Sequence, residues 1–316
     1  MHEQIYTKLP KRRRGVPTRY NHFTRSRLNG FLAQSVMQLN PKVFQHHIAN
    51  HVYHNDTGAR QTIDKLLAGK ESEFWKTSLS DEFGRLAQGV EKNRLPKKHV
   101  AGINTIFFIP QDKFTSNTKV TYANLICDLR PLKSETHRVK MIVGGDKLVY
   151  DGDPSSPTIS LLNTKIFLNS VISYAHKGER FSSADIKNHH LQSPMKQFQY
   201  MHIPLKYFTD EIRQEYNIMD ISENGYGYIE IRKGIYSFKI AGIIAFNYVV
   251  NNVAPHGYYP VRYTPSLWKH ETRKTTLMLC VDDFGIRHHS QDDLDHLLNA
   301  LCTKYDIRFK LDKTYT

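Results

Sequence analysis

Cysteine, long apolar runs and acidic residues are all scarce in this chain of 316 residues. The three cysteines, Cys127, Cys280 and Cys302, are too few for a disulfide scaffold and show no Cys-x-x-Cys spacing, which indicates a reducing compartment or no redox role. The longest nearly apolar stretch, 240–250, is too short to span a bilayer, so no membrane association is expected. The first residues also lack the apolar segment of a secretory signal. An apolar share of 40% nevertheless supports a real core.

Basic residues outnumber acidic ones by 44 to 30, which gives a formal net charge of +14. Residues 1–30 hold eight basic residues and one acid, so half of the excess lies in the first tenth of the chain. A basic chain favours a polyanionic partner, usually nucleic acid, although charge that only maintains solubility is the alternative. The run Lys11–Arg14 is typical of a nuclear-import or phosphate-contacting patch, or of a solvated tail. We therefore expect an intracellular protein, cytoplasmic or nuclear.

The chain divides into three parts by composition. Residues 1–28 are polar, basic and aperiodic and predict a flexible tail. Residues 29–100 predict a helical region that ends in a polar linker over 88–99. Its apolar residues recur at helical spacing at Phe74, Trp75, Leu79, Phe83 and Leu86.

Residues 101–316 predict a mixed fold, an α+β sheet with helices on one face. Helices are expected over 157–175, over 239–253 and from Ser290, where Asp293 completes a capping pattern. Strands are expected at 105–109, 120–129, 138–143, 181–186, 226–232, near 261–268, 275–281, 284–288 and in the alternation at 307–311.

Two adjacent carboxylates, Asp282 and Asp283, follow the apolar run 277–281 at the tip of an expected hairpin. Their mutual repulsion is most easily relieved by a divalent cation, and carboxylate oxygens suit Mg²⁺. Paired Mg²⁺ ions held in this way catalyse phosphoryl transfer in polymerases. The alternative is a plain surface turn, where Asp is common. Asp185 ends another short strand and supplies the distant third ligand that such a site needs.

These motifs resemble the reverse transcriptase domain of copia-type LTR retrotransposons, in particular a branch found in protists such as diatoms. The likeness runs from about Glu73 to the last residue. It is carried by these blocks, in order: EFGRLAQG at 82–89, NTIFFIP at 104–110, ETHRVK at 135–140, VGGD at 143–146, LNSVIS at 168–173, ADIKN at 184–188, EIRKG at 230–234 and VDDFG at 281–285.

The resemblance implies the fingers and palm of a right-hand polymerase, with a ferredoxin-like palm sheet. Asp185 and Asp282 would be the metal-binding aspartates and Asp283 their companion. Two Mg²⁺ ions, or Mn²⁺ in their place, would activate the primer 3′-hydroxyl and stabilise charge on the incoming deoxynucleoside triphosphate. The implied partners are an RNA or DNA template with a DNA primer. Arg138 and Lys140 match the basic fingers strand that contacts triphosphate and template, although a solvated strand face is the alternative.

The sequence departs from the family pattern at the expected nucleotide site. The family places a small residue and an aromatic where this chain has His189 and His190. Its Gly-x-Tyr-Gly block becomes Gly-Ile-Tyr236-Ser237, so a side chain stands where backbone usually approaches the nucleotide. His190, Tyr236 and Ser237 therefore remain expected nucleotide-binding positions with altered chemistry.

The resemblance also implies a truncated copy, because the chain ends 33 residues after Asp283, before the thumb and RNase H domains. The second functional hypothesis is therefore a catalytically inactive retroelement fragment that retains only nucleic-acid binding.

Two other patterns have plainer interpretations. Residues 56–59 read Asp-Thr-Gly-Ala, as in retroviral proteases, but the preceding segment is too polar for that site and favours a turn. His46, His47, His51 and His54 match no known zinc spacing, so a structural zinc is disfavoured.

Overall fold

The computed structural model describes residues 52, 61–91, 94–114, 118–130, 133–147, 153–280, 283–305 and 307–310. The expected basic tail, the Asp-Thr-Gly-Ala turn, the N-terminal histidines and Asp282 lie outside these residues. The chain forms two compact units, and nearly all described residues belong to the larger one, Tyr53–Cys127 with His137–Thr316. Segment Asp128–Thr136 belongs to the other unit, where Arg130 forms an ion pair with Glu135 at 2.7 Å.

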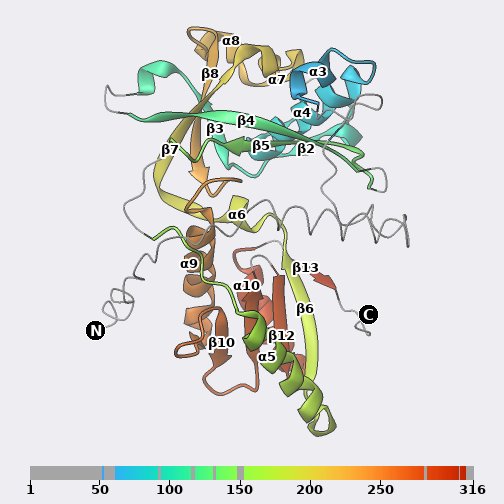
Figure 1. The fold of residues 1–316 in the computed structure, drawn as a ribbon, viewed down its shortest axis with the longest axis vertical. Coiled ribbons are helices and arrows are strands. Elements are labelled where there is room, and N and C mark those ends of the chain that lie inside the picture. Colours follow the sequence, from blue (N-terminus) through green and yellow to red (C-terminus); the bar gives the residue numbers. More distant parts are fainter. Residues whose placement is uncertain are drawn as a thin grey trace, which may run out of the picture. The chain divides into compact units, whose positions relative to one another are not determined.

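The α-helices are α3 (Ile63–Leu67), α4 (Ser72–Leu86), α5 (Leu161–Tyr174), α6 (His189–Gln192), α7 (Asp210–Tyr216), α8 (Ile218–Ile221), α9 (Ala241–Val253) and α10 (Gln291–Cys302). The strands are β1 (Gly89–Val90), β2 (Val100–Ala101), β3 (Ile106–Ile109), β4 (Val120–Leu129), β5 (His137–Val143), β6 (Arg180–Ile186), β7 (Pro194–Pro204), β8 (Tyr226–Lys233), β9 (Tyr258–Pro260), β10 (Leu267–His270), β11 (Thr276–Cys280), β12 (Asp283–His288) and β13 (Ile307–Lys310). Short 3₁₀ turns connect several of them (Figure 1). In the part of the chain that the structure describes, none of the helices is long and apolar enough to cross a membrane.

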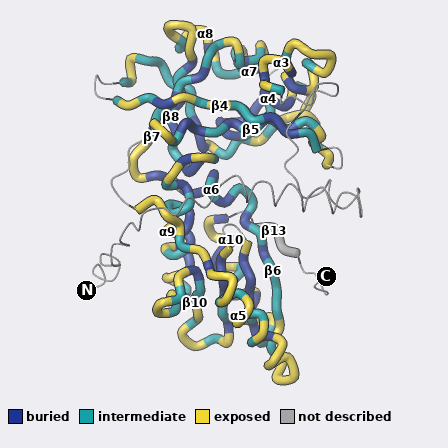
Figure 2. Tube along the Cα trace, viewed as in Figure 1, coloured by how far each residue is buried: buried dark blue, intermediate teal, exposed yellow. Residues whose placement is uncertain are grey.

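A six-stranded sheet has the order β13-β6-β12-β11-β10-β9, and every neighbouring pair is antiparallel. Successive strand residues point to opposite faces, so Phe284 and Ile286 share one face of β12, and Asp283 and Gly285 the other. The first face is buried under α9 and α10. Its core cluster includes Ala184, Ile186, Val249, Val253, Trp268, Leu277, Leu279, Phe284, Ile286, Leu294, Leu297 and Leu301 (Figure 2).

Helix α5 packs on the opposite face of this sheet, which corrects the expectation that the helices cover one face only. Phe167 from α5 forms a second small core with Met278 and Phe181, and its ring centroid lies 6.2 Å from that of Phe181. The helix contacts this face around Phe181 and Met278. Asp185 and Asp283 lie farther along β6 and β12, on the same face. The end of this face that carries Asp185 and Asp283 is therefore polar.

A five-stranded sheet has the order β3-β8-β7-β4-β5. The pairs β3–β8 and β7–β8 are antiparallel, whereas β4 and β7 are parallel. Strand β5 lies at the sheet edge, where backbone N–H groups need other partners. Helix α4 supplies them: Ser78 Oγ accepts from the N–H of Val139 at 2.8 Å, and Glu82 Oε1 accepts from that of Met141 at 3.1 Å.

The sequence prediction of one strand near 261–268 is wrong. Strands β9 and β10 flank a turn there, and Tyr263 and Ser266 have φ angles of 60° and 66° within it. Left-handed backbone at these two residues is incompatible with a continuous strand. The long strand β7 was not predicted at all.

Candidate functional site

The strongest candidate site lies at one end of the six-stranded sheet, where β6 and β12 bring two aspartates together. Asp185 on β6 and Asp283 on β12 are direct partners in the antiparallel register. Residues directly opposite in such a pair have Cβ atoms about 4.5–5.5 Å apart and lie on the same face. Asp283 is exposed and Asp185 is half-buried. The register thus brings together Asp185 and Asp283, two of the three carboxylates that the sequence assigns to one site.

The flanking residues explain why the carboxylates lie at this position. Ala184 and Ile186 alternate with Asp185 and enter the core, as Phe284 does beside Asp283. Each strand is thus held by its apolar face, and the carboxylates are left on the opposite side. A cavity of about 290 Å³ opens there, lined by Ser183, Ala184, Asp185 and Asp283. Ser183 is a polar neighbour that the sequence motifs did not single out.

The two carboxylates provide hard oxygen donors, which fit Mg²⁺ better than a thiolate- or imidazole-binding metal. Like charges in directly opposite positions are destabilising in a sheet. Among the described residues, no group of three His, Cys, Asp or Glu side chains could hold a metal ion. The third expected ligand, Asp282, lies outside them, so a three-carboxylate site stays a prediction.

A second set of expected residues meets at the end of β5. The Lys140 ammonium lies 5.9 Å from the ring centroid of Tyr236, in cation–π geometry. The Tyr236 carbonyl accepts from the N–H of Val143 at 3.1 Å. Ser237 has a left-handed backbone with φ of 63°. The structure thus brings together Lys140, Tyr236 and Ser237, three of the residues that the motifs assign to nucleotide or template.

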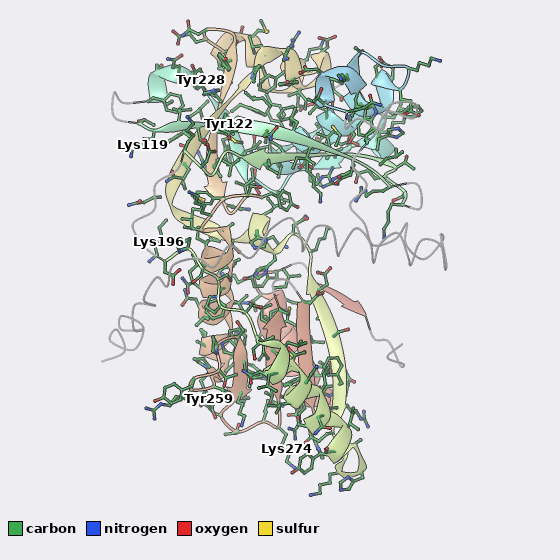
Figure 3. The ribbon with its side chains drawn as sticks, in the orientation of Figure 1. Lys119, Tyr122, Lys196, Tyr228, Tyr259 and Lys274 are labelled. Atoms are coloured by element: carbon green, nitrogen blue, oxygen red, sulfur yellow. The ribbon has the colours of Figure 1, made fainter. Side chains whose placement is uncertain are left out.

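The glycines that end β5 are needed for this arrangement. A Cβ on Gly145 would lie 2.5 Å from the Ser237 carbonyl oxygen, and one on Gly144 would lie 2.6 Å from the Tyr122 ring. The Tyr122 hydroxyl, on the sheet region labelled in Figure 3, donates to Asp146 at 2.8 Å. This hydrogen bond lowers the pKa of Asp146 and raises that of Tyr122. The turn after β5 therefore packs against the Tyr122 side chain at Gly144 and against the backbone of Ser237 at Gly145.

Arg138 has a different environment from the solvent-facing strand position that alternation with Val139 suggests. It is 8% exposed, and its guanidinium lies 3.3 Å from Glu82, which is itself 1% exposed. Glu82 also faces Arg85 at 3.6 Å. The motif EFGRLAQG contains Glu82, but alternation and motif spacing do not reveal that it binds β5. The only feature of the sequence that could have indicated this role is that Glu82 is a charged residue within an apolar helical stretch.

His190 lies on α6, a single helical turn next to the end of β8. Its side chain is half-buried, whereas that of His189 is buried, with its ring 5.7 Å from that of Tyr305. A Cβ on Gly234 would lie 2.7 Å from the His190 carbonyl oxygen, so α6 and the end of β8 are in close backbone contact. The part of His190 in a nucleotide site stays a prediction.

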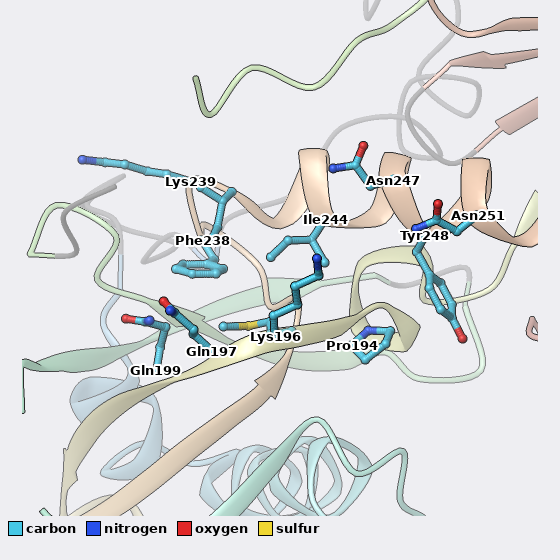
Figure 4. A pocket seen from close by; sticks show the side chains of 12 residues that line it. Pro194, Lys196, Gln197, Gln199, Phe238, Lys239, Ile244, Asn247, Tyr248 and Asn251 are labelled. Carbon is cyan, nitrogen blue, oxygen red and sulfur yellow. The ribbon is translucent and has the colours of Figure 1, made fainter. Parts of the chain in front are cut away.

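A larger cavity, of about 580 Å³, lies between the start of β7 and helix α9 (Figure 4). One face of α9 enters the core through Ala245, Phe246, Val249 and Val253. The other face presents Ile244, Asn247, Tyr248 and Asn251 to this cavity, at the spacing of one helical side. Lys196, Gln197, Gln199, Phe238 and Lys239 complete most of its lining. The sequence motifs did not identify this cavity, because β7 was not predicted.

Comparisons with known proteins describe the fold more than the chemistry. The sequence matches no family model, and no curated protein matches it. One similar solved structure is apo telomerase from Candida tropicalis, truncated from its C-terminal domain, with a TM-score of 0.37, 9% identity and coverage of 77% of this chain and 56% of that one. Another is telomerase from Candida albicans with a TWJ fragment of telomeric RNA, with a TM-score of 0.41, 11% identity and coverage of 78% and 47%.

The chain therefore spans about half the length of these telomerase chains, at 56% and 47%. It has a mixed α+β fold with a coarse likeness to these telomerase chains. Because both TM-scores are below 0.5, no assignment of active-site residues follows from the likeness.

Proposed function

We propose that this chain is a reverse transcriptase-like nucleic-acid polymerase domain of the copia retrotransposon type. The single observation that carries the proposal is the register of β6 and β12. It places Asp185 opposite Asp283 beside a cavity, on a face that the nearby helices leave open. The motif order around these two strands supports the same function.

Asp185, Asp282 and Asp283 would hold two Mg²⁺ ions, which supply charge neutralisation at the transferred phosphoryl group when bound. The chain's own part is to fix the carboxylates. The apolar faces of β6 and β12 pack into the core and fix the backbone of both strands. The two carboxylates are therefore held near each other before substrate binds, which reduces the entropy lost on binding. An RNA or DNA template, a DNA primer and deoxynucleoside triphosphates are the proposed substrates.

Lys140 and Tyr236 are proposed to contact the incoming triphosphate or template, and His190 and Ser237 to shape the sugar site. Lys140 is half-buried, and its ammonium is positioned over the Tyr236 ring at 5.9 Å from the centroid. Arg138 would act through Glu82 to hold β5 in place, or would exchange Glu82 for a phosphate when nucleic acid binds.

The deciding experiment is primer extension on poly(rA)/oligo(dT) with Mg²⁺, comparing the full chain with Asp185→Asn. Loss of a metal ligand removes several kcal/mol of transition-state stabilisation, so we expect about a 1000-fold loss of extension. Asp112→Asn, an exposed carboxylate on a 3₁₀ turn, is the matched control and should retain activity. EDTA should abolish extension by the unsubstituted chain. Extension that survives in folded Asp185→Asn would remove the catalytic assignment.

The second candidate is an inactive fragment that still binds nucleic acid. The observation that favours it is Ser237, which holds a left-handed backbone while its carbonyl closes on Gly145. A loop already strained and closed has less room for backbone approach to a nucleotide. This hypothesis predicts salt-sensitive binding without incorporation by the folded chain, with either Mg²⁺ or Mn²⁺. Incorporation that is lost in Asp185→Asn would contradict it.

A further inference from the structure

A basic cavity lies at the other end of the six-stranded sheet from the carboxylate pair. It has a volume of about 420 Å³ and is built by the end of α5, the turn between β10 and β11, and the ends of those strands and β12. Arg287 lines it, four residues along β12 from Asp283. At about 3.4 Å a residue, this places the cavity more than about 13 Å from the carboxylates. It is a separate site.

Cations dominate the lining of this cavity. Five basic side chains, Lys177, Lys269, Arg273, Lys274 and Arg287, line it together with one acid, Glu179. They come from three separate stretches of the chain, around Lys177, over 269–274 and at Arg287, so no single charged run accounts for all of them. Assembly of like charges by tertiary structure costs electrostatic energy, and an anionic ligand offsets that cost.

The two arginines are already held by acidic side chains. Arg287 Nε donates to Glu179 at 2.8 Å, and Arg273 forms ion pairs with Asp292 at 2.6 Å and Asp293 at 3.4 Å. Both therefore have fixed positions at the cavity wall. Their charges are largely offset by these partners.

The three lysines are different. Lys177, Lys269 and Lys274 have exposed side chains, and none forms an ion pair with a described acidic residue. Lys177 lies over the ring of Tyr174, at 5.0 Å from its centroid, and Tyr174 also lines the cavity. Lys274, labelled in Figure 3, belongs to the turn at this end of the sheet. Three ammonium groups thus surround one cavity without a described counter-ion.

We propose that this lysine cavity binds the phosphate groups of a nucleic-acid strand. Lysine acts as a point charge toward phosphate and needs no fixed geometry, which suits a backbone with regularly repeated charges. A site for a small phosphorylated molecule would bury its cations, whereas these three lysines are exposed and allow a long polyanion to lie across them. The proposal does not depend on polymerase activity, because an inactive chain has the same cavity.

Lysine footprinting on the full chain tests the proposal at single residues. Acetylation rates are measured by mass spectrometry alone and with a 12-nucleotide single strand, with tripolyphosphate, or with polyglutamate. With the strand at ten times its dissociation constant, Lys177, Lys269 and Lys274 should be acetylated about tenfold more slowly. Lys65 and Lys70, exposed residues around α3, are the internal controls and should be unaffected.

Protection by the strand confirms the site. Protection by tripolyphosphate alone or by polyglutamate alone overturns the assignment to a nucleic-acid strand, as does equal acetylation in every arm. A second measurement uses the triple variant Lys177→Gln, Lys269→Gln and Lys274→Gln, whose exposed positions tolerate substitution.

The slope of log affinity against log salt should fall by about 2 in this variant, since each lost contact to a single strand contributes about 0.7. The charge-matched triple variant Lys65→Gln, Lys70→Gln and Lys98→Gln should keep the original slope. Equal slopes in the two triple variants would overturn the proposal. Primer extension is not a readout in either experiment, so failure here and failure of the proposed polymerase activity remain distinguishable.

Discussion

Gly285, two residues from Asp283 on β12, has no space for a side chain. An added Cβ would lie 3.0 Å from Met278 Cγ and 3.2 Å from Phe181 Cζ, on the face where α5 packs. Gly285→Ala should therefore lower the free energy of unfolding by about 1–3 kcal/mol through overpacking. Urea denaturation measures this. Gly69→Ala is the control, because its Cβ would meet only ordinary contacts at 3.4 Å and beyond. An equal effect of the two substitutions would contradict the crowding at Gly285.

Ser237 carries the opposite expectation, that loss of a side chain stabilises the protein. Its φ of 63° lies in the left-handed region, which costs a residue with a Cβ roughly 1–2 kcal/mol. Ser237→Gly should raise the free energy of unfolding by about 1 kcal/mol, after allowance for the greater freedom of glycine in the unfolded chain. Ser237→Ala keeps the Cβ and should show no such gain. Gains of similar size in both variants would indicate that the hydroxyl, and not the backbone, causes the strain.

At the scale of elements, one buried acid of α4 contributes both a hydrogen bond and a charge to its attachment to the edge of β5. Glu82 accepts a backbone hydrogen bond from Met141 and faces the buried guanidinium of Arg138. Glu82→Gln would remove the carboxylate charge that lies 3.3 Å from that buried guanidinium, at an expected cost of about 3–5 kcal/mol. Denaturation of Glu82→Gln, Arg138→Met and the double variant isolates the pair. The double variant should be more stable than the sum of the single effects predicts, whereas additive effects would contradict the coupling.

A partly buried pair links α7 to the segment after β1 and gives the fold a pH dependence. Arg94 donates through Nη2 to Glu211 at 2.6 Å and through Nη1 to Asp81 at 2.7 Å. The hydrogen bonds from Arg94 lower the pKa of Glu211 below its usual value of 4.5. A lowered carboxyl pKa contributes stability that is present above the unfolded pKa and lost as pH falls toward the folded one.

The free energy of unfolding should therefore drop more steeply between pH 6 and pH 3 in the unsubstituted protein than in Glu211→Gln. Chemical denaturation at several pH values in this range gives both curves. Parallel curves would show that the pair does not couple folding to protonation. Asp220→Asn, on α8, is a suitable exposed control.

Periodicity in the sequence predicts most of these elements, because their apolar faces are regular. Strand β4 has the predicted bounds, and α5 begins at Leu161 because the Ser160 hydroxyl accepts from the N–H of Asn163 at 3.1 Å. Strand β7 escaped prediction because its apolar and polar residues alternate only after a register shift between Pro194 and Gln199. An irregular strand such as β7 is stabilised by hydrogen bonds to its neighbours β8 and β4, and these long-range contacts leave no regular alternation in its own sequence.

The candidate site was predictable in part for a related reason. Asp185 lies near the end of β6 and Asp283 begins β12, and both strands have strong apolar faces, so sequence alone could place both aspartates at a sheet end. The pairing of Arg138 with Glu82 could not be predicted, because it joins residues 56 positions apart through the packing of α4 on an edge strand. The basic cavity is formed by three separate chain segments, so no contiguous motif predicts it.

For the whole molecule, the formal charge of +14 is divided between the first 30 residues and the rest of the chain. On the described part, the carboxylate pair and the lysine cavity lie at opposite ends of one sheet face. Helix α5 packs on the part of this face between them, so a polyanion that reached both sites would pass over α5. Affinity should therefore be a sum over separate contacts, each with its own salt dependence.

The N-terminal basic run tests this additivity. Replacement of Lys11, Arg12, Arg13 and Arg14 by Gln removes four charges. If these residues contact a single strand, the slope of log affinity against log salt should fall by up to about 3, independently of the change caused by the lysine-cavity variant. Fluorescence anisotropy from 50 to 300 mM KCl, with a labelled strand and the combined variant, measures both, and the two decreases should add. A combined slope equal to that of either variant alone would mean that the tail and the cavity compete for the same phosphates. An unchanged slope in the tail variant would assign that charge to solubility instead of binding.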